Sequence, residues 1–361
     1  MKLNIINLTE KFKNIKLNAS LMVLKKLINK PGDEVREMLE GMAMAFPEII
    51  RLDPQWNNVY RAYKKPGSKV ALVTGGGSGH EPAHAGYVGY GMLDAASAGA
   101  TFTSPTVPQI FAAIKEVATD AGVLIIIKNY SGDVMNFTAA AKMAQAQGIK
   151  VDYVIVNDDV SIAEKSKRRG TTITVLVHKI AGAAAEEGWT LPEVKRVAQK
   201  VIDNGRDIGI ALTPCSVPAA GKPTFELGPD EIEFGIGIHG EPGVQRMKYM
   251  TSSELAKIMV DKIVDDLKLQ KGDEIFLVVQ GTGGTPYMEK FVFYRDVRKY
   301  VESLGFKVFG SWIGEFMTSL EMQGGRVAIL RLDEELKRLL MAPAYTIAIR
   351  TIGPIPLPVV T

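Results

Sequence analysis

Residues 69–82 read Lys-Val-Ala-Leu-Val-Thr-Gly-Gly-Gly-Ser-Gly-His-Glu-Pro, a short apolar run followed by a glycine-rich segment that ends at a histidine. The apolar run predicts a buried β-strand, and the glycines predict a turn at its carboxyl end. Such a turn offers backbone N–H groups to a small polar ligand and holds His80 at its rim. A purely structural strand-to-helix connection is the alternative interpretation.

A second histidine lies in a similar setting. Residues 235–242 read Gly-Ile-Gly-Ile-His-Gly-Glu-Pro, so His80 and His239 both follow an apolar run with glycines and precede a Glu-Pro pair. Histidine transfers protons near neutral pH and can also act as a nucleophile. We therefore expect the two segments, far apart in the sequence, to form two halves of one site.

The first half of the chain alternates between strand-like and helix-like patterns. Strand-like runs cover 69–74, 122–128, 151–156 and 171–177, and helix-like runs cover 136–147, 161–169 and 190–204. This β-α-β order predicts an α/β sheet with ligand-binding loops at the carboxyl ends of its strands.

The pattern changes near residue 208, where prolines interrupt a loop-rich stretch. Beyond it, strand-like runs cover 231–238, 274–279, 307–312 and 327–332, and helix-like runs cover 251–267 and 287–304. We predict two α/β domains, residues 22–208 and 209–339, each a mixed or mostly parallel sheet flanked by helices. Residues 1–21 are expected to form a loosely ordered extension before a helix that opens at Met22. The tail, 340–361, could return to the first domain.

Composition narrows the class of protein. The 361 residues are 46% hydrophobic and 23% charged with a net charge of +3, which is ordinary for a soluble globular protein and predicts no nucleic-acid partner. The basic cluster 165–169 is interpreted as a solvated helix end rather than a phosphate contact. The single Cys215 excludes an intrachain disulfide, fits a reducing cytosol, and is interpreted as a buried thiol. No apolar run reaches the ~18 residues of a membrane span, so we expect a cytoplasmic protein.

Neither familiar nucleotide-binding motif is present. A Walker loop requires a lysine after its glycines, and none follows the segment 75–79. The dinucleotide motif Gly-x-Gly-x-x-Gly fails because His80 or Pro82 occupies the position of its third glycine. The chain is therefore not predicted to hold a nucleotide itself.

Residues 128–133, Lys-Asn-Tyr-Ser-Gly-Asp, follow the most hydrophobic strand candidate. On a loop leaving a buried strand, Lys128 can donate to a substrate oxygen, and Asp133 can accept a proton from a hydroxyl. Asp133 could instead cap the helix that begins near Val134 or Asn136. The two roles are compatible.

His84 and His178 have structural interpretations that we prefer. His84 lies four residues after His80, a spacing that could hold a metal, but Glu81 is the only nearby carboxylate. His178 follows a strand-like run and is interpreted as a hydrogen-bonded structural histidine.

Two further motifs are interpreted in the same way. The adjacent carboxylates Asp158 and Asp159 favour a helix start over a magnesium site, and residues 281–286 favour a structural turn. No metal site is predicted.

Taken together, these motifs resemble the K subunit family of dihydroxyacetone kinases. The likeness extends from about Lys25 to about Ala344. Its specific segments are residues 74–82, the following 85–93 (Ala-Gly-Tyr-Val-Gly-Tyr-Gly-Met-Leu), 128–133, 178–183 (His-Lys-Ile-Ala-Gly-Ala) and 237–243.

The resemblance implies a two-domain subunit that binds dihydroxyacetone covalently. His239 would add through a ring nitrogen to the ketone carbon and give a hemiaminal, which excludes glycerol because glycerol has no carbonyl. Asp133 would accept the proton of the attacking hydroxyl, with His80 assisting. The residues implied to hold the substrate's oxygens are Gly77, Ser78, Gly79, His80, Lys128 and Asp133.

The resemblance also implies partners. No cofactor is expected on this chain, since ATP or ADP and Mg²⁺ would lie on a separate L subunit, recharged by a phosphotransferase-system phospho-carrier or by exchanging ATP. A homodimer is implied, and neither a nucleic acid nor a membrane is. Two alternatives stay open: a non-catalytic ketone-binding coactivator or sensor, and a kinase subunit for a related ketose such as erythrulose. The joint presence of His80, Lys128, Asp133 and His239 favours catalysis.

Overall fold

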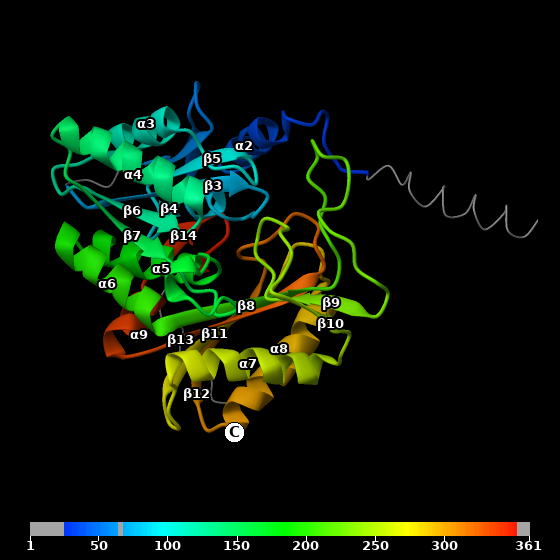
Figure 1. Cartoon of the computed structure of the whole chain (residues 1–361). Helices are drawn as coiled ribbons and strands as arrows, with labels where there is room; N and C mark the ends of the chain where they lie inside the picture. Colours follow the sequence, from blue (N-terminus) through cyan, green and yellow to red (C-terminus); the bar gives the residue numbers. More distant parts are fainter. Residues whose placement is uncertain (1–24, 64–67, 352–361) are drawn as a thin grey trace, which may run out of the picture.

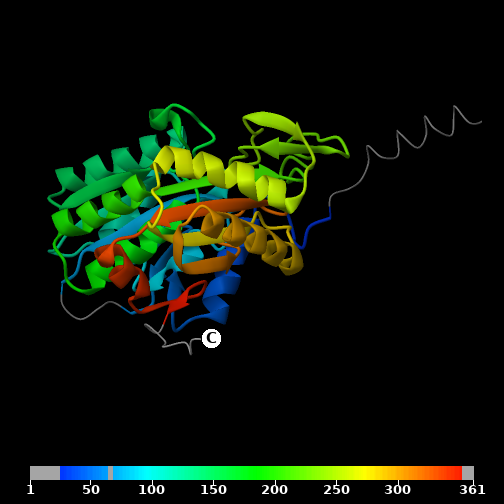
Figure 2. The same ribbon diagram turned by 90° about the horizontal axis from the view of Figure 1, so that it is seen from below.

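The computed structural model describes residues 25–63 and 68–351, and it forms alternating layers of helix and sheet (Figure 1). Two six-stranded sheets lie on either side of a central pair of helices, and further helices cover the two outer faces. Figure 2 shows the same arrangement turned by 90°. The predicted fold class, α/β with two mixed sheets flanked by helices, is confirmed.

The first sheet carries the first histidine. Its strand order is β1 (Ile50–Leu52), β2 (Asn58–Arg61), β5 (Ala95–Thr101), β3 (Ala71–Ser78), β6 (Val123–Lys128) and β7 (Val151–Val156). Strands β5, β3, β6 and β7 run parallel to one another. Strand β2 pairs antiparallel with both β1 and β5. Helices α3 (Val107–Val117) and α4 (Ser131–Ala146) pack against this sheet. Every residue of β6 is buried, as expected of a strand that is covered on both faces.

The second sheet is mostly antiparallel. Its strand order is β10 (Gln245–Lys248), β9 (Glu231–Phe234), β8 (Gly205–Ala211), β13 (Gly324–Arg331), β11 (Glu274–Gly281) and β12 (Lys307–Gly314), and only β11 and β12 pair in parallel. Helices α7 (Ser252–Leu267) and α8 (Tyr287–Ser303) cover its outer face. A capping box opens α7, where the Thr251 side chain accepts from the N–H of Glu254.

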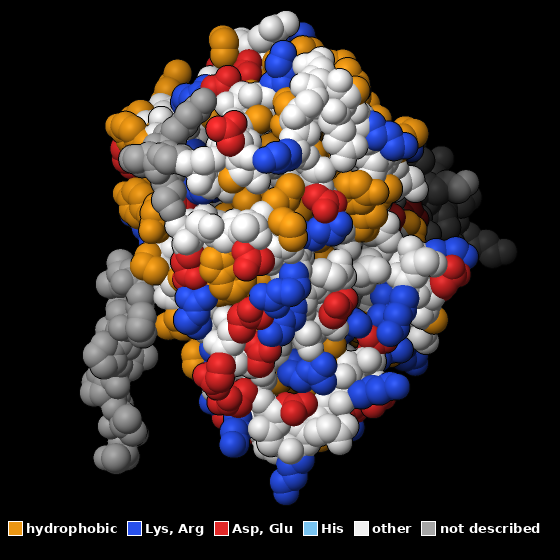
Figure 3. Space-filling model, turned by 90° about the vertical axis from the view of Figure 1, so that its left-hand side faces the viewer, with side chains coloured by type: hydrophobic (Ala, Val, Ile, Leu, Met, Phe, Trp, Pro, Cys, Tyr) orange, Lys and Arg blue, Asp and Glu red, His pale blue; other side chains and the backbone are white. Residues whose placement is uncertain are grey.

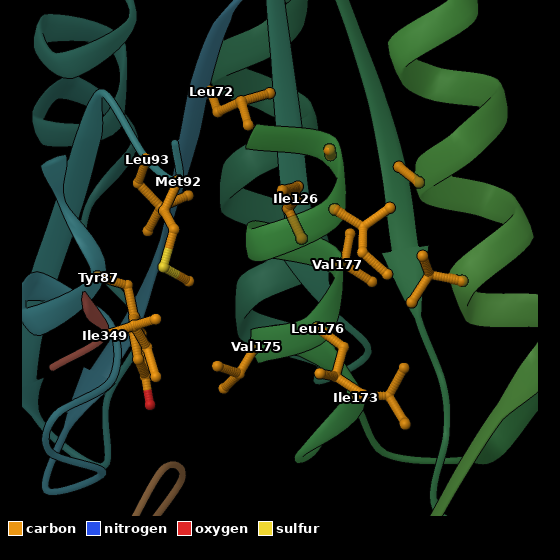
Figure 4. Close-up of a cluster of buried hydrophobic side chains, with 14 of the residues drawn as sticks. Leu72, Tyr87, Met92, Leu93, Ile126, Ile173, Val175, Leu176, Val177 and Ile349 are labelled. Carbon is orange, nitrogen blue, oxygen red and sulfur yellow. The ribbon is translucent and has the colours of Figure 1, made fainter. Parts of the chain in front are cut away.

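The central helices join the two sheets. Helix α5 (Ile173–Glu186) contacts β3, β6 and β8, and α6 (Leu191–Asn204) contacts strands of both sheets. The strand predicted for 171–177 is therefore wrong. Figure 4 shows Ile173, Val175, Leu176 and Val177 on this helix, among side chains of β3 and β6 such as Leu72 and Ile126. A helix that is buried on every side lacks the polar face that would distinguish it from a buried strand.

Three other boundaries differ from the predictions. The helix expected over 161–169 is only the 3₁₀ turn η2 (Lys165–Lys167), because Arg168 and Arg169 turn inward to buried carboxylates. Strand β3 continues through the glycines to Ser78, and β9 ends at Phe234, before the predicted residue 238. The helix start expected at Met22 and the extension 1–21 lie outside the described residues.

The end of the described chain packs against the first sheet's region. Helix α9 (Glu334–Met341) packs on α5, and β14 (Ala344–Thr346) joins β15 (Arg350–Thr351) to β4 (Gly89–Tyr90). The remaining short elements are α2 (Glu34–Ala45) and η1 (Ala85–Tyr87). The predicted division at residue 209 stays a prediction, and β8, which spans that position, is hydrogen-bonded within the second sheet.

The surface carries both signs of charge. On the face in Figure 3, Lys and Arg side chains are interspersed with Asp and Glu side chains. The described residues form exposed ion pairs such as Arg196–Glu335 and Arg338–Glu187. Within the described residues, no helix is long and apolar enough to cross a membrane.

Candidate functional site

The two histidine segments meet in the folded chain. The ring centroids of His80 and His239 are 4.6 Å apart and the rings are nearly perpendicular, at 81°. His80 follows β3 of the first sheet, and His239 follows β9 of the second. The geometry therefore agrees with the expectation that the two segments form one site.

Two aromatic rings enclose the histidines. Phe102 stacks on His80 at 5.3 Å and meets His239 edge-on at 5.5 Å, and the ring of Tyr130 lies 4.3 Å from that of His239. Phe102 has a φ of 58°, a conformation that non-glycine residues rarely adopt and that is concentrated at functional sites. Sequence reasoning singled out neither ring. Tyr130 lay within the motif 128–133, but Phe102 had no local signal.

The hydrogen bond of His80 indicates its tautomer. Its Nδ1 lies 2.9 Å from the carbonyl oxygen of Thr318, and because a carbonyl only accepts, Nδ1 carries the proton. The unprotonated Nε2 is buried and has no hydrogen-bond partner among the described residues. Burial, followed by the nearby His239 and Lys128, lowers the pKa of His80 well below its usual value. His80 is therefore neutral, with one nitrogen free to accept a proton.

His239 is also held neutral. Burial, with smaller contributions from Lys128 and Arg169, lowers its pKa to about 3. An unprotonated imidazole has a nitrogen lone pair, which is the requirement for nucleophilic attack. The backbone N–H of His239 donates to Glu241 Oε2 at 2.8 Å.

Lys128 and Asp133 form a buried ion pair beneath the first glycine segment. The Lys128 ammonium lies 3.2 Å from Asp133 Oδ2, donates to the Gly75 carbonyl at 3.2 Å, and contacts His84 Nε2 at 2.9 Å. The Gly75 carbonyl and His84 Nε2 are its hydrogen-bond partners, whereas Asp133 Oδ2 is buried and accepts no hydrogen bond from a described residue. A Cβ on Gly76 would overlap the Lys128 ammonium, so only glycine fits there.

Asp133 lies in the first turn of α4, not at its N-cap. The helix begins at Ser131, earlier than predicted, and Tyr130 is its N-cap residue. The positive end of a helix favours a carboxylate in its first turn. The expectation that Asp133 caps the helix is therefore wrong.

The three remaining substrate-binding candidates shape the strand end. The Ser78 hydroxyl donates to the Gly99 carbonyl at 2.7 Å, and this bond ties β3 to β5. A Cβ on Gly77 would come within 2.7 Å of the Phe102 backbone, and one on Gly79 within 2.7 Å of the Phe102 ring. These glycines make room for the ring that stacks on His80.

The two Glu-Pro pairs share a local geometry. Glu81 accepts from the N–H of Gly79 at 3.0 Å, and Glu241 accepts from the N–H of His239 at 2.8 Å. In each case the carboxylate accepts from the amide two residues before it, so the turn encloses His80 in the first loop and Gly240, next to His239, in the second.

The other sequence candidates lie away from this pair of histidines. His178 lies on α5, fully buried, and within the described residues neither ring nitrogen has a hydrogen-bond partner, so the expected hydrogen-bonded histidine at a strand end is wrong. No helix starts at Asp158 or Asp159, so that expectation is wrong; Asp158 instead accepts from the N–H groups of Thr171 and Ile173 at the distant start of α5.

The remaining motifs are structural in their contacts. Thr282 and Thr285 of the turn 281–286 donate to the carbonyls of Met322 and Gly324. Cys215 is buried and free. The described residues contain no group of three or more His, Cys, Asp or Glu side chains arranged to hold a metal ion.

The chain is similar in sequence to proteins of a known family. The Dak1 domain family matches residues 40–348. The "PTS-dependent dihydroxyacetone kinase 1, dihydroxyacetone-binding subunit DhaK" of Listeria innocua is 49% identical over 329 residues, 90% of this chain and 100% of that protein.

Two solved structures share the fold. The "dihydroxyacetone kinase operon co-activator" DhaQ superposes with a TM-score of 0.84 at 34% identity, over 90% of this chain and 99% of its own. The dihydroxyacetone kinase of C. freundii superposes with a TM-score of 0.83 at 33% identity, over 93% of this chain and 62% of its own. With its family match and its 49% identity to a full-length relative, the chain belongs to the Dak1 domain family.

Proposed function

We propose that this chain is the dihydroxyacetone-binding subunit of a dihydroxyacetone kinase. The observation that carries the proposal is the meeting of a neutral His239 with a neutral His80 whose Nε2 is free, above the buried Lys128–Asp133 pair. The name of the Listeria relative supplies the substrate, and the chain's own residues supply the chemistry.

Capture of the ketone is the first step. A ring nitrogen of His239 forms a bond to the carbonyl carbon, the carbonyl π bond breaks, and the proton on the other ring nitrogen is lost as the oxygen gains one. The step therefore needs no reagent besides the ketone and the protein. The ring of His80 lies 4.6 Å from that of His239, and its Nε2, which has no hydrogen-bond partner among the described residues, can relay this proton. Phe102 and Tyr130 exclude water from the adduct.

Activation of the hydroxyl is the second step. The carboxylate of Asp133 accepts the proton of the hydroxyl that attacks the phosphoryl group. Lys128 lies 3.2 Å from this carboxylate, and Gly76 leaves the space that this pair requires. Gly77, Ser78 and Gly79 position the end of β3 against the substrate's oxygens.

The phosphoryl group comes from a partner. A separate L subunit would carry the nucleotide and Mg²⁺, and a phosphotransferase-system phospho-carrier would recharge it, in keeping with the name of the Listeria relative. We place the subunit in the cytoplasm, as a homodimer.

The test is intact-mass spectrometry of the protein with dihydroxyacetone, and with glycerol as the matched control. We expect an adduct with the ketone only, lost in His239→Ala. A coupled assay with a cognate L subunit and ATP or a phospho-relay donor should then give dihydroxyacetone phosphate. The capture step fails if the wild-type protein gives no adduct.

The second candidate function is a ketone-binding coactivator. It is favoured by one observation, the TM-score of 0.84 to the co-activator DhaQ. An adduct without phosphoryl transfer in the coupled assay would support it. A related ketose such as erythrulose is distinguished in the same assay by comparing kcat/KM for the two ketones.

A further inference from the structure

Two buried arginines hold the backbone that leads to His239. Arg169 Nη2 donates to the carbonyl of Gly235 at 2.6 Å, and Arg326 Nη1 donates to the carbonyl of Ile236 at 2.9 Å. Arg326 also reaches the Gly237 carbonyl at 3.4 Å. Three consecutive carbonyls just before His239 therefore accept from guanidinium groups.

Each arginine is anchored by its own carboxylate. Arg326, on β13 and fully buried, pairs with Asp207 on β8 at 2.7 Å. Arg169 pairs with Asp159 at 2.6 Å, in the segment between β7 and α5. Arg326 thus belongs to the second sheet, like the His239 loop, whereas Arg169 reaches this loop from the connection that follows the first sheet.

Arg169 contacts the loop on both sides of the histidine. Besides the Gly235 carbonyl, its Nη1 lies 3.3 Å from Glu241 Oε1, and the other oxygen of Glu241 accepts the N–H of His239. The chain from Arg169 through Glu241 to the His239 amide is continuous. A planar guanidinium makes these contacts together with its bonds to Asp159, which a lysine cannot do.

We propose that Arg169, acting with Glu241, is a positioning residue for His239: it fixes the loop against the first sheet's half of the site and provides a positive charge that disfavours protonation of the ring. The inference rests on the proposed function, because it deepens the capture step. It concerns a residue that touches the histidine's loop, not the substrate.

The charge environment of His239 agrees with this role. The groups that act on the ring from the neighbouring elements are Lys128 of β6, His80 after β3, Tyr130 before α4, and Arg169 with its partner Glu241. Burial, then Lys128, then Arg169 lower the pKa of His239 to about 3. Without Arg169, one of the two cationic contributions is lost.

The adjacent arginine provides a matched control. Arg168 is equally buried and ion-paired, but its guanidinium binds Asp266 on α7 at 2.6 Å. Arg168→Gln and Arg169→Gln therefore both remove a buried ion pair, and only the second touches the His239 loop.

The experiment measures two quantities for the wild type, Arg168→Gln, Arg169→Gln and Arg169→Lys. The first is the ¹³C shift of the His239 ring in ligand-free protein between pH 4.5 and 8, assigned with His239→Gln. The second is the rate of dihydroxyacetone adduct formation by intact mass, with the thermal unfolding midpoint as the control for global folding.

The proposal predicts a distinct result for each variant. Wild type and Arg168→Gln keep a flat ring shift over this range, and their adduct rates agree within about twofold. Arg169→Gln begins to titrate inside the range and forms the adduct about tenfold more slowly at pH 6, a change that corresponds to about 1.4 kcal/mol. Arg169→Lys keeps the flat shift, because it keeps the charge, but forms the adduct more slowly than wild type.

The opposite results overturn it. If Arg169→Gln matches Arg168→Gln in both ring shift and adduct rate, Arg169 is only structural. If Arg169→Gln does not fold, Glu241→Gln decides: slower adduct formation with a flat ring shift supports the proposal, and an unchanged rate overturns it. If wild type forms no adduct, the proposed function fails, while the ring shift in the Arg169 variants still tests the electrostatic role.

Discussion

The loops around His80 and His239 have similar sequences, but different contacts stabilise them. The first is the end of a β-strand, closed by glycines that fit against Phe102 and by the Thr318 carbonyl. The second lies beyond the end of its strand and is held by the guanidinium groups of Arg169 and Arg326. The shared motif therefore determines the turn beside each histidine. The residues that pack against each loop determine the chemistry of its histidine.

The difference separates two tasks. Beside the first loop lie Asp133, the proton acceptor that we propose, and His80 Nε2, which has no hydrogen-bond partner among the described residues. Beside the second loop lies Arg169, which, after burial and Lys128, lowers the pKa of His239. We therefore expect variants of the first loop's surroundings to change phosphoryl transfer, and variants of the second loop's surroundings to change ketone capture.

The largest expected effect comes from Asp133→Asn. It removes the proton acceptor while keeping the shape, so turnover with the L subunit should fall by about 10²–10⁴. Adduct formation on His239 should persist, because His239 is held by other residues. Steady-state kinetics and intact mass measure the two quantities. His239→Ala is the reciprocal control, and loss of the adduct in Asp133→Asn would contradict the separation of tasks.

Acid should destabilise the protein through its four buried histidines. His178 and His239 have pKa values lowered to about 3, and burial also lowers the pKa of His80 and His84. Below the unfolded value of about 6.5, the unfolded chain binds protons that the native chain does not, so stability falls as pH falls.

The size of this loss can be measured by urea denaturation. Each of the two histidines with a pKa of about 3 should reduce the free energy of unfolding by about 2 kcal/mol between pH 7 and pH 5. His178→Leu should lose less stability over this range, because it removes one titrating group without disturbing a hydrogen bond. An equal pH dependence in this variant would show that His178 titrates normally in the native state.

Alanine at one glycine beside each loop should test the comparison directly. A Cβ on Gly76 would overlap the Lys128 ammonium, whereas a Cβ on Gly237 would overlap the Glu241 carboxylate. Both variants should unfold more easily, by about 1–3 kcal/mol. Gly76→Ala should mainly slow turnover, and Gly237→Ala should mainly slow adduct formation.

Gly148→Ala is the control for backbone conformation, since Gly148 has a φ of +81° and nothing within 4 Å of its Cβ. It should lower stability without changing either rate. If turnover and the rate of adduct formation fall by the same factors in Gly76→Ala and in Gly237→Ala, the two loops do not have separate tasks.

Local signals in the sequence predicted much of this architecture. The glycine–histidine motifs indicated a shared site, and the helix predicted over 190–204 is α6, which begins at Leu191 with Thr190 as its N-cap residue. Helix α5 was missed because it is buried on every face, and the short β-branched run at its start has no period that distinguishes helix from strand.

The residues that complete the site could not be predicted either, and the reason is different. Phe102, Thr318, Arg169 and Arg326 reach the histidines only through long-range packing, and their own segments carry no motif. Arg169 was interpreted as part of a solvated basic cluster, but it is buried against Asp159. A charge pattern in the sequence does not show which cations find a buried partner.

The smallest expected effect compares the two Glu-Pro carboxylates. Burial raises the pKa of Glu81. Among the described residues, the Gly79 N–H donates to its carboxylate. A glutamine keeps an oxygen that accepts this N–H, so Glu81→Gln should lower the free energy of unfolding at pH 7 by less than about 1 kcal/mol. Its adduct rate should equal that of wild type, whereas Glu241→Gln, which breaks the ion pair with Arg169, should be slower. Urea denaturation and intact mass on the two variants decide this, and equal slowing in both would show that the His80 and His239 loops depend on their carboxylates in the same way.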